Sequence, residues 1–159
     1  MKIFDCFMFN NQIEIFNKRV EKHFDYVESF VIAQGKFNYD GSEKEFVDLY
    51  GKKLTHIINE ERISSKTIQR NLIMKGLEKC NSEDIIIFSR INEFVDFDRL
   101  LPFIKVLDFF PISLGLSNRG NQAGPIVTKY KYLKSFTLSQ LRNQRNFLLK
   151  LENGSFYEN

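Results

Sequence analysis

The run Ile85–Phe88 constrains the fold more than any other stretch, because its four residues are all apolar and the chain turns polar immediately afterwards. A short continuous apolar run is typical of a strand buried on both faces, as in a mostly parallel sheet covered by helices. In open sheets of this kind, ligands bind beyond the carboxyl ends of the strands. The sequence therefore predicts an α/β protein with a polar site that begins at Ser89.

The other elements alternate between strand and helix patterns. Strands are predicted at 2–9, 26–33, 53–59, 84–89, 106–114 and 125–133, with loops over 34–45 and 115–124 and coil over 152–159. Helices are predicted over 64–80, 97–105 and 137–151, and after Asn10 or Asn11, where Ile13, Phe16, Val20 and Phe24 recur on one face. This alternation predicts a parallel-type sheet with right-handed crossovers.

Three of the helices have candidate cap residues. These are Asn11 with Glu14 three residues later, Ser64 or Ser65, and Thr137 or Ser139. Gly76 lies inside the helix predicted over 64–80, where glycine costs about 1 kcal/mol relative to alanine. We therefore expect a neighbouring element to pack closely against Gly76.

The composition is that of a folded domain rather than a disordered chain. Its 159 residues suit a single domain over 1–159, and 43% of them are hydrophobic. The formal charge of +3 fits a site for phosphates or acidic sugars. It is a weak indication of nucleic-acid binding, because no run of Lys and Arg is long enough to make a continuous footprint.

Cysteine, histidine and hydropathy patterns exclude several classes. Cys6 and Cys80 are too few for a disulfide framework, so we expect free thiols in a reducing compartment. His23 and His56 have no Cys or His neighbours at metal-ligand spacing, which argues against a zinc site. The first apolar run is broken by Asp5 and has no signal-peptide cleavage site, and no run approaches the roughly 20 residues of a membrane span. We therefore expect a soluble cytoplasmic protein.

Polar side chains follow the predicted strands at the edge where a ligand would bind. The strand ends carry Phe9-Asn10, Gln34-Gly35, Asn59-Glu60 and the stretch Arg90 to Glu93. These amides, carboxylates and one cation suit a polar ligand. They match no phosphate-binding loop, dinucleotide fingerprint or nucleophile elbow.

Four blocks carry a resemblance to a known family. They are FDCFMFNNQIEIFNKRV, FVIAQGKFNYDGSEKEF, QRNLIMKGLEKCNSEDIIIFSRINEF and GPIVTKYKYL, which cover most of the chain. In this order they resemble the family 17 glycosyltransferases, the group that includes the bisecting N-acetylglucosaminyltransferase of N-glycans. The resemblance implies the GT-A fold of nucleotide-diphosphosugar transferases, with a nucleotide-sugar donor (N-acetylglucosamine is one candidate sugar) and a glycan acceptor.

The chain departs from the family pattern mainly by losing negative charge. Where the family has Ser-Asp-Val-Asp-Glu, this chain has Arg90 and Asn92 in place of the two aspartates and keeps Glu93. Gln34 stands where the family usually has Glu. A late block survives only as 154–157, without its Trp and His, so the chain is C-terminally truncated relative to the family.

The lost aspartates change the expected chemistry. Asn92 offers a divalent ion only a neutral carbonyl and Arg90 repels it, so no cofactor is expected and a role for Mn²⁺ or Mg²⁺ is doubtful. Arg90 and Lys44 are predicted to hold the diphosphate instead. Glu93 is the candidate general base for the acceptor hydroxyl. The predicted substrate-binding residues are Asp5, Asn10, Gln34, Lys44, Arg70, Asn71, Arg90 and Asn92.

Three functions stay open on the sequence. A metal-independent sugar transferase is favoured by the retained Glu93 and by the helix residues Gln69 to Asn71. A binding or structural module without catalysis is favoured by the lost aspartates, and in that case Arg90 only pairs with Glu93. The third is nucleic-acid binding through a basic, aromatic-rich surface. The short C-terminal end is also compatible with a homo- or hetero-oligomer.

Overall fold

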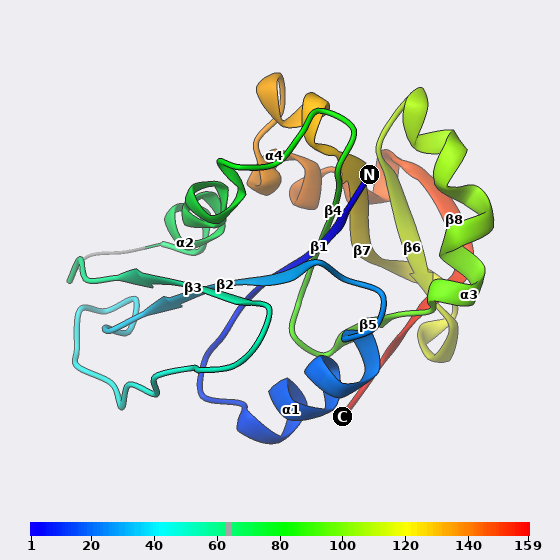
Figure 1. Ribbon diagram of the computed structural model, residues 1–159. Coiled ribbons are helices and arrows are strands. Elements are labelled where there is room, and N and C mark those ends of the chain that lie inside the picture. The colour runs from blue at the N-terminus through cyan, green and yellow to red at the C-terminus, as the bar shows by residue number, and fades with distance from the viewer. Residues whose placement is uncertain (63–64) are drawn as a thin grey trace.

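The computed structural model describes residues 1–62 and 65–159, and its centre is an eight-stranded sheet (Figure 1). The strands are β1 (Ile3–Met8), β2 (Ser29–Gly35), β3 (Leu54–Asn59), β4 (Ile85–Ser89), β5 (Glu93–Val95), β6 (Ile112–Leu116), β7 (Gln122–Lys129) and β8 (Leu149–Tyr157). Their spatial order is β3-β2-β1-β4-β7-β6-β8-β5. Of the seven neighbouring pairs within the described residues, β3-β2, β2-β1, β1-β4 and β6-β8 are parallel. The predicted α/β fold with a mostly parallel sheet is confirmed.

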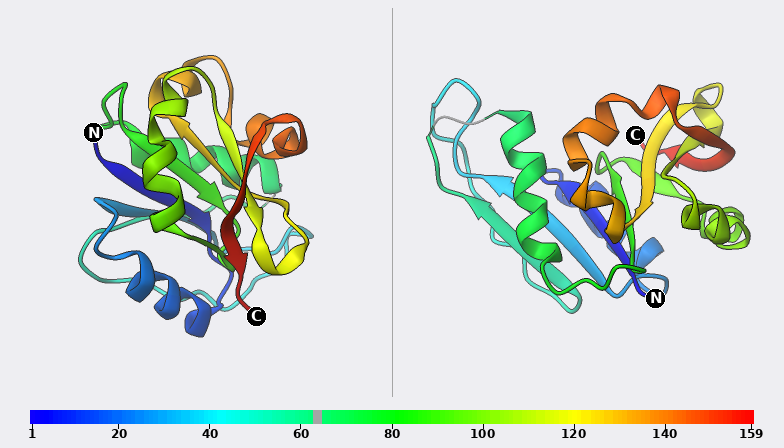
Figure 2. Two further views of the ribbon diagram at one scale, coloured as in Figure 1. Left: turned by 90° about the vertical axis from the view of Figure 1, so that its right-hand side faces the viewer. Right: turned by 90° about the horizontal axis from the view of Figure 1, so that it is seen from above.

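Helices cover both faces of this sheet (Figure 2). They are α1 (Ile13–His23), α2 (Lys66–Leu72), α3 (Phe97–Leu100) and α4 (Leu138–Asn143), with 3-10 segments η1 (Ile73–Leu77), η2 (Leu101–Asp108), η3 (Ser117–Arg119), η4 (Tyr130–Lys134) and η5 (Arg145–Phe147). Residues of α1, α3 and η2 join one buried apolar cluster, and residues of η1 and α4 join the other. Within the described residues, no helix has the length and apolar character needed to cross a membrane.

The apolar run at Ile85–Phe88 forms the buried strand β4. Ile85 and Ile87 belong to the cluster under α1 and α3, while Ile86 and Phe88 belong to the cluster under η1 and α4. A strand covered on both faces needs apolar residues at every position, which explains why the run does not alternate. The prediction drawn from this run is confirmed.

Two of the predicted helix starts are confirmed. The Ser65 hydroxyl accepts a hydrogen bond from the Ile68 amide at 3.2 Å and caps α2, while the alternative cap, Ser64, lies outside the described residues. Thr137 caps α4 in a capping box with Gln140. In both helices the side chain satisfies a backbone N–H that would otherwise lack a partner at the first turn.

The predicted cap of α1 is wrong. Asn11 adopts φ 62° and donates a hydrogen bond from Nδ2 to the Glu45 carbonyl oxygen at 2.7 Å. Gln12 is the N-cap residue and makes no side-chain cap hydrogen bond. Asn11 therefore holds the loop after β2 in place of forming the expected capping box with Glu14.

Gly76 lies in η1, where it packs against β2 and β3. A Cβ atom at this position would lie 2.4 Å from Val31 Cγ1 and 3.3 Å from Thr55 Cγ2. The close approach predicted for Gly76 is confirmed. The expectation of free thiols is also met, because Cys6 and Cys80 are both unpaired.

The prediction for the C-terminal end is wrong. The helix expected over 137–151 ends at Asn143, and the expected coil belongs to β8, which pairs with β6 and β5. The helical spacing of apolar residues was overridden by pairing with strands that lie far away in the sequence. Asn153 at φ 54° and Gly154 lie where the β6-β8 register shifts, so the strand bends at this point.

Several other boundaries also move. β2 begins at residue 29 in place of 26, and β7 covers 122–129 in place of 125–133. β6 begins at residue 112, because residues 101–108 form η2. The helix predicted over 64–80 is divided between α2 and η1 and ends at residue 77.

Candidate functional site

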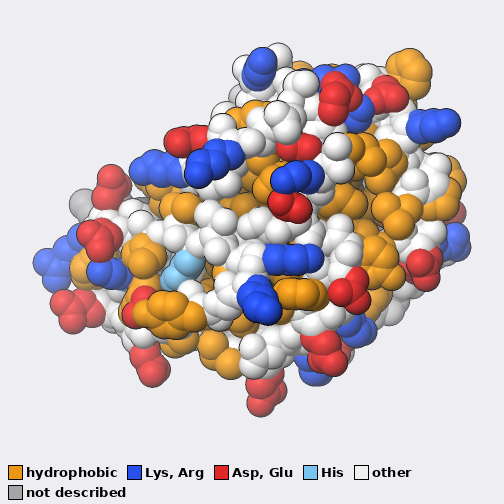
Figure 3. Space-filling model, in the orientation of Figure 1, with side chains coloured by type: hydrophobic (Ala, Val, Ile, Leu, Met, Phe, Trp, Pro, Cys, Tyr) orange, Lys and Arg blue, Asp and Glu red, His pale blue; other side chains and the backbone are white. Residues whose placement is uncertain are grey.

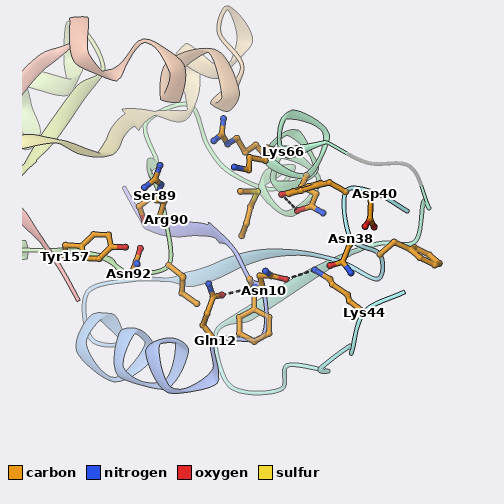
Figure 4. A pocket seen from close by; sticks show the side chains of 17 residues that line it. Asn10, Gln12, Asn38, Asp40, Lys44, Lys66, Ser89, Arg90, Asn92 and Tyr157 are labelled. Atoms are coloured by element: carbon orange, nitrogen blue, oxygen red, sulfur yellow. Dashed lines mark hydrogen bonds between the residues drawn. The ribbon is translucent and has the colours of Figure 1, made fainter. Parts of the chain in front are cut away.

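A cleft of about 730 Å³ lies at the carboxyl ends of β1, β2 and β4 (Figure 4). It is bounded on one side by α2 and on another by the end of β8. The lining residues are Met8, Phe9, Asn10, Gln12, Phe37, Asn38, Tyr39, Asp40, Lys44, Lys66, Gln69, Arg70, Ser89, Arg90, Ile91, Asn92 and Tyr157. This is the edge of the sheet at which the sequence placed the site.

Five of the predicted substrate-binding residues line this cleft: Asn10, Lys44, Arg70, Arg90 and Asn92. The Lys44 ammonium donates a hydrogen bond to Asn10 Oδ1 at 2.8 Å, which joins the loops that follow β1 and β2. Burial lowers the pKa of Lys44 from its ordinary value. Figure 4 shows this pair on the side of the cleft away from Arg90.

The charged residues of the lining are mostly cations. They are Lys44, Lys66, Arg70 and Arg90, against the single carboxylate of Asp40. Hydrogen bonds from Ser42 lower the pKa of Asp40, so this carboxylate is ionised at neutral pH. The space-filling view shows Lys and Arg side chains interspersed with Asp and Glu over the face that is turned to the viewer in Figure 1 (Figure 3). The lining as described therefore favours an anionic ligand.

Arg90 is the cation at the end of the central strand β4. Its side chain is exposed, and the guanidinium makes no hydrogen bond or ion pair within residues 1–62 and 65–159. Its backbone is fixed, because the Arg90 amide donates to Glu93 Oε2 at 2.9 Å. The side chain is therefore available to a ligand although its attachment point is held.

Glu93 does not line the cleft. It is 3% exposed, and its Oε1 atom accepts a hydrogen bond from Arg142 Nη2 at 2.6 Å. Both carboxylate oxygens thus have protein partners, Arg142 and the Arg90 amide. This geometry does not support the predicted role of Glu93 as a general base. It also differs from the predicted pairing between the Arg90 and Glu93 side chains, since Arg142 takes that place.

Asp5 is also away from the cleft, in a buried network with two α1 residues. Arg19 donates from Nη2 to Asp5 Oδ1 at 2.6 Å and from Nε to Oδ2 at 2.9 Å, and His23 Nδ1 lies 2.8 Å from Oδ2. These two neighbours hold the pKa of Asp5 well below its usual range, although burial opposes them. The predicted substrate contact of Asp5 is replaced by a structural one.

Arg19 also fixes the turn that carries Arg90. Its Nη1 atom donates to the carbonyl oxygens of Arg90, Ile91 and Glu93 at 3.0, 3.0 and 2.9 Å, and its Nη2 atom donates to Ser89 Oγ at 2.6 Å. The side chain is fully buried. A single guanidinium from α1 therefore sets the backbone path at the end of β4.

Gln34 and Asn71 are the other predicted residues outside the lining. Gln34 is fully buried, with Oε1 2.9 Å from His56 Nε2 and Nε2 3.4 Å from Asn11 Oδ1. Asn71 has a buried Oδ1 atom without a hydrogen-bond partner among the described residues. Asn71 directly follows the lining residue Arg70 in the sequence, but neither Gln34 nor Asn71 lines the cleft.

Sequence reasoning missed the following lining residues: Gln12, Phe37, Asn38, Tyr39, Asp40, Lys66 and Tyr157. Four of these come from the loop after β2, where Tyr39 donates a hydrogen bond to Gln69 Oε1 at 3.3 Å. The Asp40-Gly41 turn signal marked this segment as a loop but did not show that it folds over the cleft. Tyr157 reaches the cleft through β8, which was not predicted.

The lining does not suit a divalent metal ion. At the position of the family's aspartates, Asn92 supplies a neutral oxygen and Arg90 supplies a positive charge, and Asp40 is the one carboxylate of the lining. Mg²⁺ and Mn²⁺ need several hard anionic oxygens. In the part of the chain that the structure describes, no three His, Cys, Asp or Glu side chains group as metal ligands would.

Comparison with known proteins identifies the fold and no family. No protein-family model and no curated protein matches this chain. The crystal structure of Francisella tularensis 2-C-methyl-D-erythritol 4-phosphate cytidylyltransferase is similar, with a TM-score of 0.60 and 9% identity over 96% of this chain and 90% of that chain. At this identity the likeness shows the fold alone. The chain therefore has a GT-A-like α/β fold, and membership of glycosyltransferase family 17 is not supported by these matches.

Proposed function

We propose that this chain binds a nucleotide-activated sugar through its diphosphate, and that cationic side chains replace the metal ion. The observation that carries this proposal is Arg90, whose guanidinium has no partner among the described residues and lies in a mostly cationic cleft at the carboxyl end of β4. A guanidinium binds two phosphate oxygens in parallel. Arg90 is presented on a turn that Arg19 holds, so little ordering is needed when the ligand binds.

The opposite side of the cleft suits the uncharged parts of such a ligand. Asn10, Gln12 and Asn38 supply amide donors and acceptors for a nucleobase edge or for sugar hydroxyls. Phe37 and Tyr39 supply aromatic surface from the loop after β2. Amide and aromatic side chains thus line the same cleft as the cations, which suits a molecule with a diphosphate between two neutral rings.

The proposed reaction is transfer of the sugar to a hydroxyl group of a glycan acceptor. Negative charge develops on the leaving diphosphate, and Arg90 with Lys66 supplies the compensating positive charge. Asp40 is the carboxylate of the lining that is able to accept the acceptor's proton, because Glu93 is occupied by Arg142.

The second candidate is a binding module of the same fold that no longer catalyses transfer. The buried Glu93–Arg142 pair favours it, since the carboxylate retained from the family pattern does not face the cleft. The two candidates share the donor site and differ in turnover. Release of free nucleoside diphosphate from a donor, with or without acceptor, distinguishes them.

A thermal-shift screen of nucleotide-sugars, with Mn²⁺ in one arm and EDTA in the other, tests the proposal. A donor at 100 to 1,000 times its dissociation constant stabilises the folded state by about 2.7–4.1 kcal/mol. We expect at least one nucleotide-sugar to raise the melting temperature equally in both arms. A shift that requires Mn²⁺, or no shift with any donor, contradicts the proposal.

A further inference from the structure

Four arginines gather beside the cleft, where α2 packs against α4: Arg70, Arg90, Arg142 and Arg145. We call them the arginine cluster. Arg70 Nη1 donates to Asn143 Oδ1 at 3.3 Å, which connects α2 to the end of α4. Arg145 donates from Nη1 to the Arg142 carbonyl oxygen at 2.9 Å and from Nε to the Ala123 carbonyl oxygen at 3.1 Å. Hydrogen bonds thus hold the side chains of Arg70, Arg142 and Arg145 in place, while Arg90 is held through its backbone.

The cluster carries more positive charge than the protein neutralises. Glu93 pairs with Arg142, and among the described residues no carboxylate pairs with Arg70, Arg90 or Arg145. Burial and the neighbouring arginines lower the pKa of both Arg70 and Arg145. This mutual repulsion persists unless an anion binds, so the arrangement costs stability in the empty protein.

The groups that hold Arg70 and Arg145 are neutral. Arg70 contacts the amide of Asn143, and Arg145 contacts backbone carbonyls. Neutral acceptors orient a guanidinium but leave its charge available to a ligand. A carboxylate would orient the guanidinium and also neutralise its charge. The proposed function assigns the diphosphate to Arg90 and Lys66 and assigns no anion to Arg70 or Arg145.

We propose that Arg70, which lines the cleft, and Arg145, which lies beside it, bind the anionic group, a carboxylate or a phosphate, of a second ligand next to the nucleotide. This inference rests on the proposed function in one respect: if the chain transfers a sugar, the second ligand is the acceptor. The acceptor is an acidic or phosphorylated sugar in place of a neutral glycan. Its anion lies where α2 meets α4, and its hydroxyl groups face the donor.

Isothermal titration calorimetry tests this inference on the full chain, saturated with the nucleoside diphosphate that binds most tightly. The probes are glucose 6-phosphate, glucuronate and, as the neutral control, glucose. We expect the two anionic probes to bind the loaded protein and glucose to give no signal. The phosphate and carboxylate probes together identify which anion the site prefers.

Two variants report on the site, and Arg145→Gln also loses the hydrogen bonds of Arg145 to the Ala123 and Arg142 carbonyl oxygens. Asn143→Asp places a carboxylate beside Arg70, and Arg145→Gln keeps a hydrogen-bond donor while removing the charge. Each is expected to weaken binding of glucose 6-phosphate by about tenfold or more, the scale of a lost charge-assisted contact. Arg99→Gln, on α3 outside the cleft lining, is the control and leaves both affinities unchanged.

The outcomes separate this inference from the proposed function. If nucleoside diphosphate binds but the anionic probes do not, or displace it, the inference is overturned and the donor site stands. If a nucleoside triphosphate binds more tightly than the diphosphate and both variants remove this difference, Arg70 and Arg145 bind a phosphate group of the donor. This result also overturns the inference. If no nucleotide binds, titration of the empty protein decides: glucose 6-phosphate binding that both variants weaken supports the anion site alone, and no binding overturns both proposals.

Discussion

Arg142 Nη2 donates a hydrogen bond to Glu93 Oε1 at 2.6 Å, and both side chains are 3% exposed. The pair connects α4 to β5, on the far side of the turn that carries Arg90. Because Glu93 Oε2 also accepts the Arg90 amide, the carboxylate links the end of α4 to the cleft. The residue predicted as catalytic is therefore a positioning residue in this fold.

Glu93→Ala is expected to lower the free energy of unfolding by about 3–5 kcal/mol, because it leaves the buried Arg142 charge without its carboxylate partner. Urea unfolding followed by circular dichroism measures the change. Glu60→Ala is the matched control, since Glu60 pairs with Lys36 on the exposed surface and its loss has little effect. Equal effects of the two substitutions would show that Glu93 is not held as described.

The Arg19–Asp5 pair is expected to show strong energetic coupling. Arg19→Met removes the partner of a fully buried carboxylate, at a cost of about 3–5 kcal/mol, and Asp5→Asn strands the guanidinium in the same way. The double variant should lose much less unfolding free energy than the two single variants together, because both charges are then absent. Additive losses in the double-mutant cycle would rule out the direct pairing.

The central strand and the location of the cleft were predictable, because both follow from one local pattern. The run that forms β4 has to be covered on both faces, and polar residues after parallel strands meet at one edge of a sheet. Asn10, Lys44, Arg70, Arg90 and Asn92 were placed at the cleft by this reasoning or by the family resemblance.

Pairings between distant residues were not predictable. Asp5 and Glu93 look like site residues in the sequence, but their orientation depends on Arg19 and Arg142, which no local pattern marks as partners. β8 was missed for the same reason, since residues 149–151 continue the helical spacing, residues 152–157 were expected as coil, and both form a strand because β6 and β5 lie beside them.

His23 is expected to make stability fall in mild acid. Burial lowers the pKa of His23 below its ordinary value of 6.5, so the folded protein keeps this ring neutral where the unfolded chain takes up a proton. The unfolding free energy therefore decreases as the pH falls from about 7 to 5, and the loss ends below the folded-state pKa. The depressed pKa of Asp5 acts in a separate, more acidic range.

His23→Gln should flatten this pH dependence. His56→Gln is the matched control, because burial also lowers the pKa of His56, which is less deeply buried. Unfolding curves at each pH give the comparison. A slope that persists in His23→Gln and disappears in His56→Gln would show that His56, and not His23, causes the pH dependence.

Introducing the acidic pair of the family 17 pattern is expected to introduce metal dependence. In the double variant Arg90→Asp with Asn92→Asp, two carboxylates face the cleft where a cation and an amide stood. Mn²⁺ should then increase nucleoside diphosphate binding, as hard anionic oxygens attract the ion. Calorimetry with and without Mn²⁺ measures this. If Mn²⁺ does not change the affinity of this variant for nucleoside diphosphates, the turn after β4 does not occupy the family's metal position.

The central claim is tested most directly by the affinity of Arg90→Ala for nucleoside diphosphates, measured by calorimetry in EDTA. Arg99→Ala is measured as the control. We expect Arg90→Ala to lose about 1.5–3 kcal/mol of binding free energy for nucleoside diphosphates, roughly 10- to 150-fold in affinity, while nucleosides bind both variants and the parent alike. Arg99→Ala should match the parent. Equal diphosphate affinity in Arg90→Ala and the parent would contradict the account.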